Sequence, residues 1–72
     1  ADHSLIYAKL APLRHAKSLI GLGRHDEAEQ ILLTLDQRFE REGDAQLRKL
    51  SRSTLAEFYE SQGRHQRARE YQ

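Results

Sequence analysis

The sequence predicts an all-α fold, built from antiparallel helix hairpins that repeat along the chain, with about four helices in total. Two observations support this prediction directly: apolar residues recur at the spacing of one helix face, and glycines divide the chain into helix-length segments. A third is negative, since no segment alternates apolar and polar residues as a half-buried strand would. A chain of 72 residues has room for one small domain, which we place at 1–72.

The first predicted helix follows Ser4, a suitable N-cap, and runs to about Leu22. Gly23 then takes the position after the helix end, where a left-handed residue is common. Pro12 lies inside this segment. Because proline lacks the amide hydrogen and its ring clashes with the preceding turn, we expect the helix to kink or to restart near Ala11.

The second predicted helix begins near Asp26, whose carboxylate suits the positive end of the helix dipole, and ends at Gly43. Its apolar residues form one stripe, namely Ala28, Ile31, Leu32, Leu35 and Phe39.

The third helix is expected to be capped by Asp44 and to end at Gly63, and the fourth to begin near His65. The inner side of the third helix is predicted to carry Leu47, Leu50, Leu55, Phe58 and Tyr59, and the fourth helix adds Ala68 and Tyr71.

An internal repeat is the most informative feature of the sequence. Gly23-Arg24-His25 recurs as Gly63-Arg64-His65, an offset of 40 positions. The same offset pairs Ser4 with Asp44, Lys9 with Lys49, Leu10 with Leu50, Ala16 with Ala56, Leu19 with Tyr59 and Ala28 with Ala68. The glycines would end a helix in the left-handed conformation, and the alanines would allow two helices to approach closely. We place repeat one at about 4–43 and a truncated repeat two at about 44–72.

The segments 22–28 and 58–68 resemble the corner of a tetratricopeptide repeat. The structural positions of that family fall on Ala16, Gly23, Ala28, Ala56, Gly63 and Ala68, with Tyr59 at the aromatic position of the repeat's first helix. The family's early Trp position holds Pro12 and Arg52, and its Leu position in repeat one holds His15. The period is also 40 and not about 34 residues. This longer period resembles the extended repeats of kinesin light chains and of bacterial signalling proteins.

The resemblance also implies a binding surface, because tetratricopeptide arrays bind peptides on the concave wall formed by the first helix of each pair. Carrying the register over, the wall residues are Leu13, Arg14, Lys17, Ile20, Ser53, Glu57 and Glu60. This wall would be basic at one end and acidic at the other. The chain has no Asn, so the Asn and Lys clamp with which part of the family holds a C-terminal carboxylate is not expected.

Composition argues against several other functions. Lys and Arg number 12 against 11 Asp and Glu, and this near balance does not favour a nucleic-acid or anionic-membrane binder. We see no apolar run of about 18 residues and no signal-peptide pattern. The absence of cysteine fits the cytoplasm, where we expect the protein to act.

We expect no catalytic, cofactor or metal site, and therefore no enzyme. His25 and His65 occupy equivalent repeat positions, which favours a structural role at the corners. The acidic residues near position 27 suit a helix start better than a paired-carboxylate site. Six basic residues form a candidate patch that is more simply interpreted as a solvated face, namely Arg48, Lys49, Arg52, Arg64, Arg67 and Arg69.

The function expected from these features is protein–protein interaction, within a larger signalling or regulatory protein. Two repeats leave the ends of the stack uncovered, so we also expect homo-oligomers through apolar end residues, namely Leu5, Ile6, Tyr7, Phe58 and Tyr71. The alternative is a structural spacer or dimerisation segment of a kinase or transcription regulator, without a ligand of its own. A helical nucleic-acid binder is a third hypothesis, for which binding would depend steeply on salt.

Overall fold

The computed structural model describes the backbone of residues 3–72 and the side chains from Ala8 onward. It contains four helices: α1 (His3–Gly21), α2 (His25–Glu42), α3 (Ala45–Ser61) and α4 (His65–Glu70). No strand occurs within residues 3–72. The predicted all-α fold with four helices is therefore confirmed.

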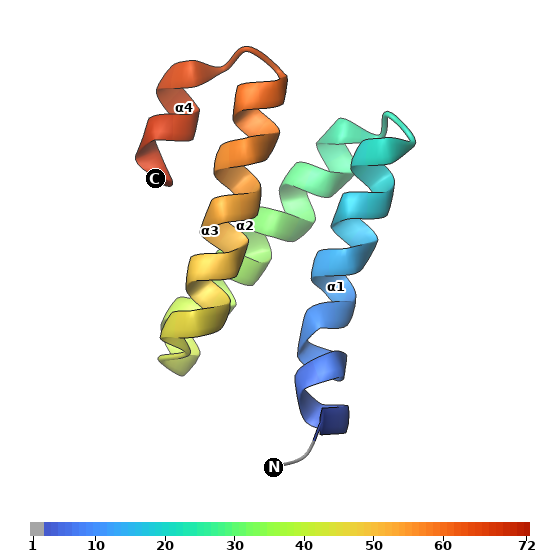
Figure 1. The fold of residues 1–72 in the computed structure, drawn as a ribbon, viewed down its shortest axis with the longest axis vertical. Helices are drawn as coiled ribbons and strands as arrows, with labels where there is room; N and C mark the ends of the chain where they lie inside the picture. Colours follow the sequence, from blue (N-terminus) through green and yellow to red (C-terminus); the bar gives the residue numbers. More distant parts are fainter. Residues whose placement is uncertain (1–2) are drawn as a thin grey trace.

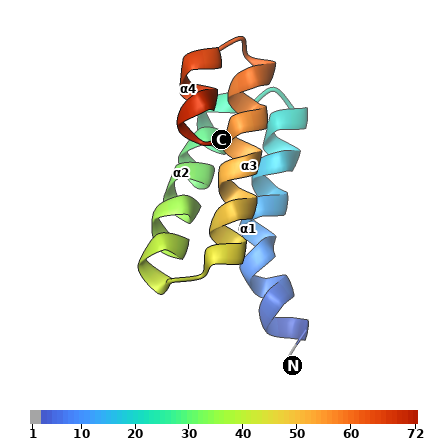
Figure 2. The ribbon, with the colours of Figure 1, turned by 60° about the vertical axis from the view of Figure 1, so that its left-hand side comes forward.

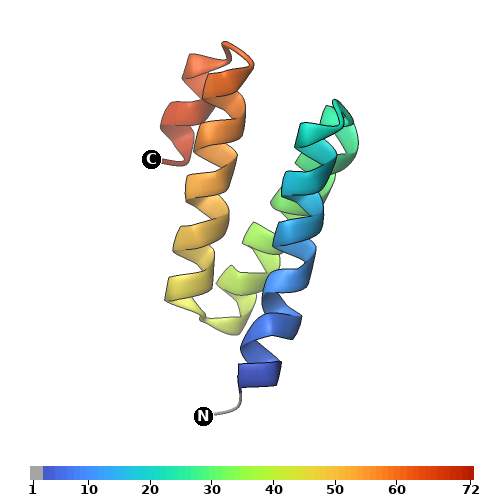
Figure 3. The same cartoon turned by 45° about the vertical axis from the view of Figure 1, so that its right-hand side comes forward.

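Each helix packs antiparallel to the one before it. Helices α1 and α3 run in the same direction, and α2 lies behind and between them (Figures 1 and 3). The α1–α2 and α3–α4 corners lie at one end of the domain, and the α2–α3 turn lies at the other. When the left-hand side of Figure 1 is brought forward, α3 lies in front of the α1–α2 hairpin, and α4 lies beside the upper part of α2 and α3 (Figure 2). The result is an open array of helices.

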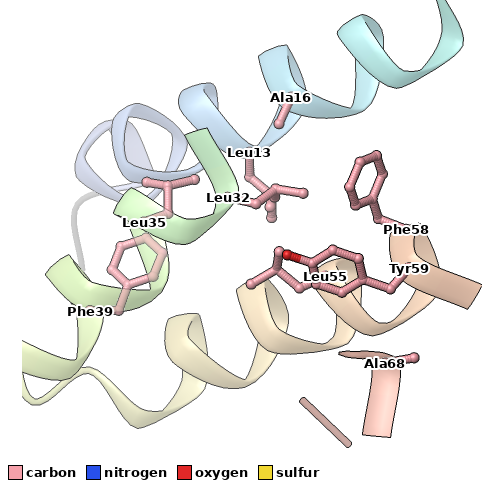
Figure 4. Close-up of a cluster of buried hydrophobic side chains, with 9 residues drawn as sticks. All are labelled: Leu13, Ala16, Leu32, Leu35, Phe39, Leu55, Phe58, Tyr59 and Ala68. Carbon is pink, nitrogen blue, oxygen red and sulfur yellow. The ribbon is translucent and has the colours of Figure 1, made fainter. Parts of the chain in front are cut away.

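One apolar cluster joins all four helices (Figure 4). Its buried members are Leu13, Ala16, Leu32, Leu35, Phe39, Leu55, Phe58, Tyr59 and Ala68. The stripe predicted for α2 lies in this core, with Ile31 packed against its edge. The prediction that Leu50 lies on the inner side of α3 is wrong, because 47% of this residue is exposed. It sits on the outer side of α3, where no neighbouring helix covers it among the residues described.

The two corners at Gly23 and Gly63 have the same backbone geometry. Gly23 has φ of 80° and Gly63 has φ of 74°. Beyond each glycine the next amide turns back to the helix: Arg24 N–H donates to the Leu19 carbonyl at 2.9 Å, and Arg64 N–H to that of Tyr59 at 2.8 Å. These bonds, together with those of the glycine amides, form the Schellman arrangement that closes a helix end.

Helix α2 is also followed by a left-handed glycine, Gly43, with φ of 71°. It differs from the other two corners in the residue that comes after the glycine. The Asp44 carboxylate accepts a hydrogen bond from the Leu47 amide at 3.2 Å and so caps α3, as predicted. At the other two corners Arg24 and Arg64 stand in this position, and neither side chain caps the helix.

Two expectations about the first helix need correction. Helix α1 begins at His3, so Ser4 is not the residue before it, and the Ser4 side chain lies outside the described part. The helix also continues through Pro12, so a restart near Ala11 is wrong, while the alternative of a kink stays a prediction. The carbonyl that Pro12 leaves without an amide partner belongs to Ala8, an exposed residue, so water can bind it in place of the missing amide.

Candidate functional site

A hollow of about 340 Å³ lies between α1 and α3, and no residue of α2 lines it. Helix α1 contributes two residues to it and α3 contributes four, namely Lys17 and Ile20, then Thr54, Glu57, Phe58 and Ser61. We call this feature the α1/α3 groove. Since α1 and α3 are parallel first helices of two hairpins, the groove is a surface to which both hairpins contribute their leading helix.

The floor of the groove is apolar. Phe58 is only 3% exposed and Ile20 is partly buried. Rings on two sides hold Phe58 in place: His25 at a centroid distance of 5.9 Å and Tyr59 at 5.4 Å. A ligand that reaches this floor would therefore meet a fixed apolar surface.

The hydroxyl groups in the groove are already engaged as donors. Thr54 Oγ1 donates to the Leu50 carbonyl at 2.9 Å, and Ser61 Oγ donates to the Phe58 carbonyl at 2.7 Å. Each bond lies within α3, so the hydroxyl hydrogens are satisfied without a ligand. The polar recognition available in the groove consequently comes from its charged rim.

The rim carries one charge of each sign. Lys17 is exposed on the α1 side and Glu57 is exposed on the α3 side. No ion pair joins these two side chains in the described structure. A ligand that crosses the groove would meet a cation on one wall and an anion on the other.

Three of the seven residues predicted for the binding wall come together in the groove: Lys17, Ile20 and Glu57. Leu13 does not belong to it. It is 6% exposed and lies in the core, because its side of α1 faces the interior formed by α2 and α3.

The remaining three predicted wall residues lie elsewhere. Arg14 is exposed on α1 outside the groove lining. Ser53 lines a different hollow on the opposite flank of α3. Glu60 lies at the corner, where its Oε2 is 3.0 Å from His65 Nδ1.

Sequence reasoning does not identify Thr54, Phe58 and Ser61 as groove residues. A signal is present, because residues 54, 57, 58 and 61 follow the i, i+3, i+4, i+7 spacing of one helix stripe. The sequence instead assigns Phe58 to the core and to an exposed stack end. The structure places it in the core, with one side forming the groove floor, so its assignment to an exposed end is wrong.

Behind the groove, Tyr59 joins three helices through polar contacts. Its hydroxyl donates to Glu29 Oε2 on α2 at 2.6 Å. The guanidinium of Arg64 lies 4.8 Å from the ring centroid and that of Arg67 lies 5.3 Å from it. Burial of the phenol and its hydrogen bond to the Glu29 carboxylate raise the pKa of Tyr59 to about 12.

A second polar cluster ties α2 to α3 and to the C-terminal end of α4. Asp36, which is buried on α2, lies 3.8 Å from Arg48 Nε and 3.7 Å from Arg52 Nη1. Arg52 also donates to the Glu70 carbonyl at 2.8 Å and lies 5.1 Å from the Tyr71 ring centroid. Two members of the predicted basic patch therefore have acidic partners within the domain.

The structure gives no positive indication of a metal centre. Among the side chains described, which begin at Ala8, no group of three or more His, Cys, Asp or Glu is placed to bind a metal ion. His25 packs on Phe58 and His65 pairs with Glu60, so each corner histidine is in contact with its own domain. Of the helices described, none combines the length and apolar character needed to span a bilayer.

Comparison with known proteins, in the form of family models, curated proteins and solved structures, gives no significant match. The class that the structure itself defines is a small all-helical domain of four sequentially packed antiparallel helices.

Proposed function

We propose that this domain is a helix-hairpin repeat module of the tetratricopeptide type, and that it binds a short extended peptide in the α1/α3 groove. The observation that carries the proposal is the make-up of the groove, an apolar floor of Ile20 and Phe58 between Lys17 and Glu57. The equal geometry of the corners at Gly23 and Gly63 supports the repeat assignment.

The groove suits a peptide better than a compact small molecule. Its volume of about 340 Å³ is at the lower end of ligand pockets, and only two helices line it. An extended peptide can place one apolar side chain on such a floor and two charged side chains on the rim. We therefore expect the preferred peptide to carry an acidic residue opposite Lys17, a central apolar residue, and a basic residue opposite Glu57.

The wider role is consistent with this binding mode. We propose a non-catalytic scaffold that belongs to a larger signalling or regulatory protein of the cytoplasm and recruits a protein partner. No nucleic-acid or membrane partner is part of the proposal, since Arg48, Arg52, Arg64 and Arg67 already pair with carboxylates of the domain.

Selection from a phage-displayed library of random short peptides tests the proposal. Wild-type protein should enrich peptides with the acidic–apolar–basic pattern. The double variant Lys17→Glu, Glu57→Lys exchanges the two rim charges, so it should enrich peptides in which the order of the charges is reversed.

The matched control is Gln37→Lys, a charge change at an exposed site on α2 away from the groove, which should enrich the same peptides as the wild type. Absence of any enrichment, or enrichment of identical peptides by the wild type and the double variant, would reject peptide binding in the groove. The domain would then be better described as a spacer within its parent protein.

A further inference from the structure

The α3 side of the α1/α3 groove continues beyond its lining residues to an exposed leucine. Leu50 is 47% exposed and precedes Thr54 and Glu57, which line the groove, by one and two turns of α3. Residues at i, i+4 and i+7 share one face of a helix, so these three residues form one stripe. We propose that Leu50 is a second apolar anchor for the bound peptide, which rests on the proposed function of the groove.

The other flank of α3 does not account for Leu50. A hollow of about 700 Å³ lies there, between α3 and the end of α4, and its lining includes Lys49 and Ser53 but not Leu50. A single exposed leucine is common on protein surfaces, so the place of Leu50 on the groove stripe carries the argument, and not its exposure alone. Leu50 is therefore assigned to the groove side of α3.

Helix geometry gives the distance between the two apolar anchors. Leu50 precedes Phe58 of the groove floor on α3, and at about 1.5 Å of rise per residue the two lie about 12 Å apart along the helix. In an extended peptide, side chains at positions p and p+4 point to the same side and lie about 13 Å apart. The second apolar residue of the peptide is consequently expected at p+4, where p is the residue on the floor.

The charged rim decides on which side of the central residue the second apolar residue belongs. The basic residue of the peptide is expected opposite Glu57 on α3, and the acidic residue opposite Lys17 on α1. Leu50 shares a helix with Glu57, whereas in the other direction the stripe ends at the hydroxyl of Ser61. A peptide that passes Glu57 and continues along α3 toward Leu50 therefore carries its second apolar residue on the basic side.

Two synthetic peptides of identical composition, blocked at both ends, test the inference. Glu-Leu-Lys-Ser-Ser-Leu has its second leucine on the lysine side, and Leu-Ser-Ser-Glu-Leu-Lys has it on the glutamate side. Each would be titrated into the isotope-labelled whole chain, with the affinity taken from the amide chemical shifts. We expect the first peptide to bind about fivefold more tightly or better, because its second leucine and Leu50 are both removed from water.

One substitution and a matched control assign the difference to Leu50. Leu50→Gln keeps a good helix former while removing the apolar contact, so it should make the two peptides bind equally. Leu22→Gln makes the same change at a leucine that is 72% exposed and does not line the groove, so the preference for the first peptide should persist.

The possible failures of this inference and of the proposed function differ. If the wild type binds both peptides equally, and exchange of the Lys17 and Glu57 charges weakens both, the groove binds peptides but Leu50 is not an anchor. A preference that survives Leu50→Gln, or that is lost in Leu22→Gln, also overturns the role of Leu50. If neither peptide binds the wild type, peptide binding in the groove is overturned and this inference with it.

Discussion

At the residue scale, three glycines close to helix ends differ in how a side chain there would change the free energy of unfolding. Gly23 and Gly63 have positive φ, whereas Gly21 is the last residue of α1. A Cβ at any of them would meet no atom within 4 Å, so the backbone conformation alone decides the outcome.

We predict that Gly23→Ala and Gly63→Ala each lower the free energy of unfolding by about 1–2 kcal/mol, because alanine is strained in the left-handed region. Gly21→Ala should instead raise it by about 0.5–1 kcal/mol, since alanine favours the helix and restricts the unfolded chain. Urea unfolding followed by circular dichroism measures all three. Equal effects at Gly21 and Gly23 would contradict the assigned corner geometry.

The raised pKa of Tyr59 has a consequence for stability in alkaline solution. The folded phenol has a pKa of about 12, above the ordinary value of 10.0 that applies in the unfolded chain. Between these values the folded state holds a proton that the unfolded state has released. The stabilisation that the protonated Tyr59 phenol gives the folded state is therefore fully present below about pH 10, and it is lost as the pH rises toward about 12.

We predict that Tyr59→Phe removes this part of the alkaline loss of stability, so that the unfolding free energy of the variant falls less between pH 10 and 12 than that of the wild type. At neutral pH the variant should be less stable by about 1–2 kcal/mol, because Glu29 loses its hydrogen-bond donor. Urea titrations at a series of pH values test both effects. Parallel pH profiles for the two proteins would show that Tyr59 is not the titrating group.

At the scale of the helices, Ala16 and Ala56 hold corresponding places, yet their surroundings differ. Ala16 has no exposed surface, whereas Ala56 is 7% exposed and borders the hollow of about 700 Å³ between α3 and the end of α4. A larger side chain would overpack the first site, whereas at the second site part of it could extend into the adjoining hollow.

We predict that Ala16→Leu lowers the free energy of unfolding by about 1–3 kcal/mol and that Ala56→Leu lowers it by less, about 1 kcal/mol at most. The comparison is matched, because both substitutions make the same chemical change within a helix. Thermal unfolding of the two variants provides the measurement. An equal loss at both sites would mean that the hollow beside Ala56 cannot accommodate the larger side chain.

At the scale of the whole molecule, one core spans both hairpins. Leu32 of α2 and Leu55 of α3 are both fully buried where the hairpins meet. Because each hairpin covers the apolar face of the other, neither has a separate core among the described residues. The two hairpins should therefore unfold together.

We predict a single unfolding transition, at the same urea concentration by far-ultraviolet circular dichroism and by tyrosine fluorescence. Leu55→Ala should remove about 2–5 kcal/mol, which is a large part of the stability of so small a domain. Two separate transitions would show that the hairpins fold independently.

Self-association through the ends of the stack remains a prediction. Three of the residues named for it, Leu5, Ile6 and Tyr7, lie outside the described side chains. Phe58 is buried and is not available for it, and Tyr71 is partly buried beside Arg52. Sedimentation at micromolar concentration decides whether the chain associates.

Features that depend on a few neighbouring residues could be predicted from the amino-acid sequence. The ends of the helices were predictable from Gly23, Gly43 and Gly63, and the start of α3 from Asp44, because a left-handed glycine or a capping carboxylate acts within one helix turn. Helical periodicity likewise identified most of the core face of α2.

The faces on which α1 and α3 meet could be learned only from the packed helices. Leu13 turns inward, Leu50 remains exposed, and Ser53 lies on the opposite flank of α3 from the groove that Lys17 and Glu57 share. These placements depend on the angle and rotation at which helices pack. That geometry is set by many side chains distant in sequence, and no local pattern specifies it.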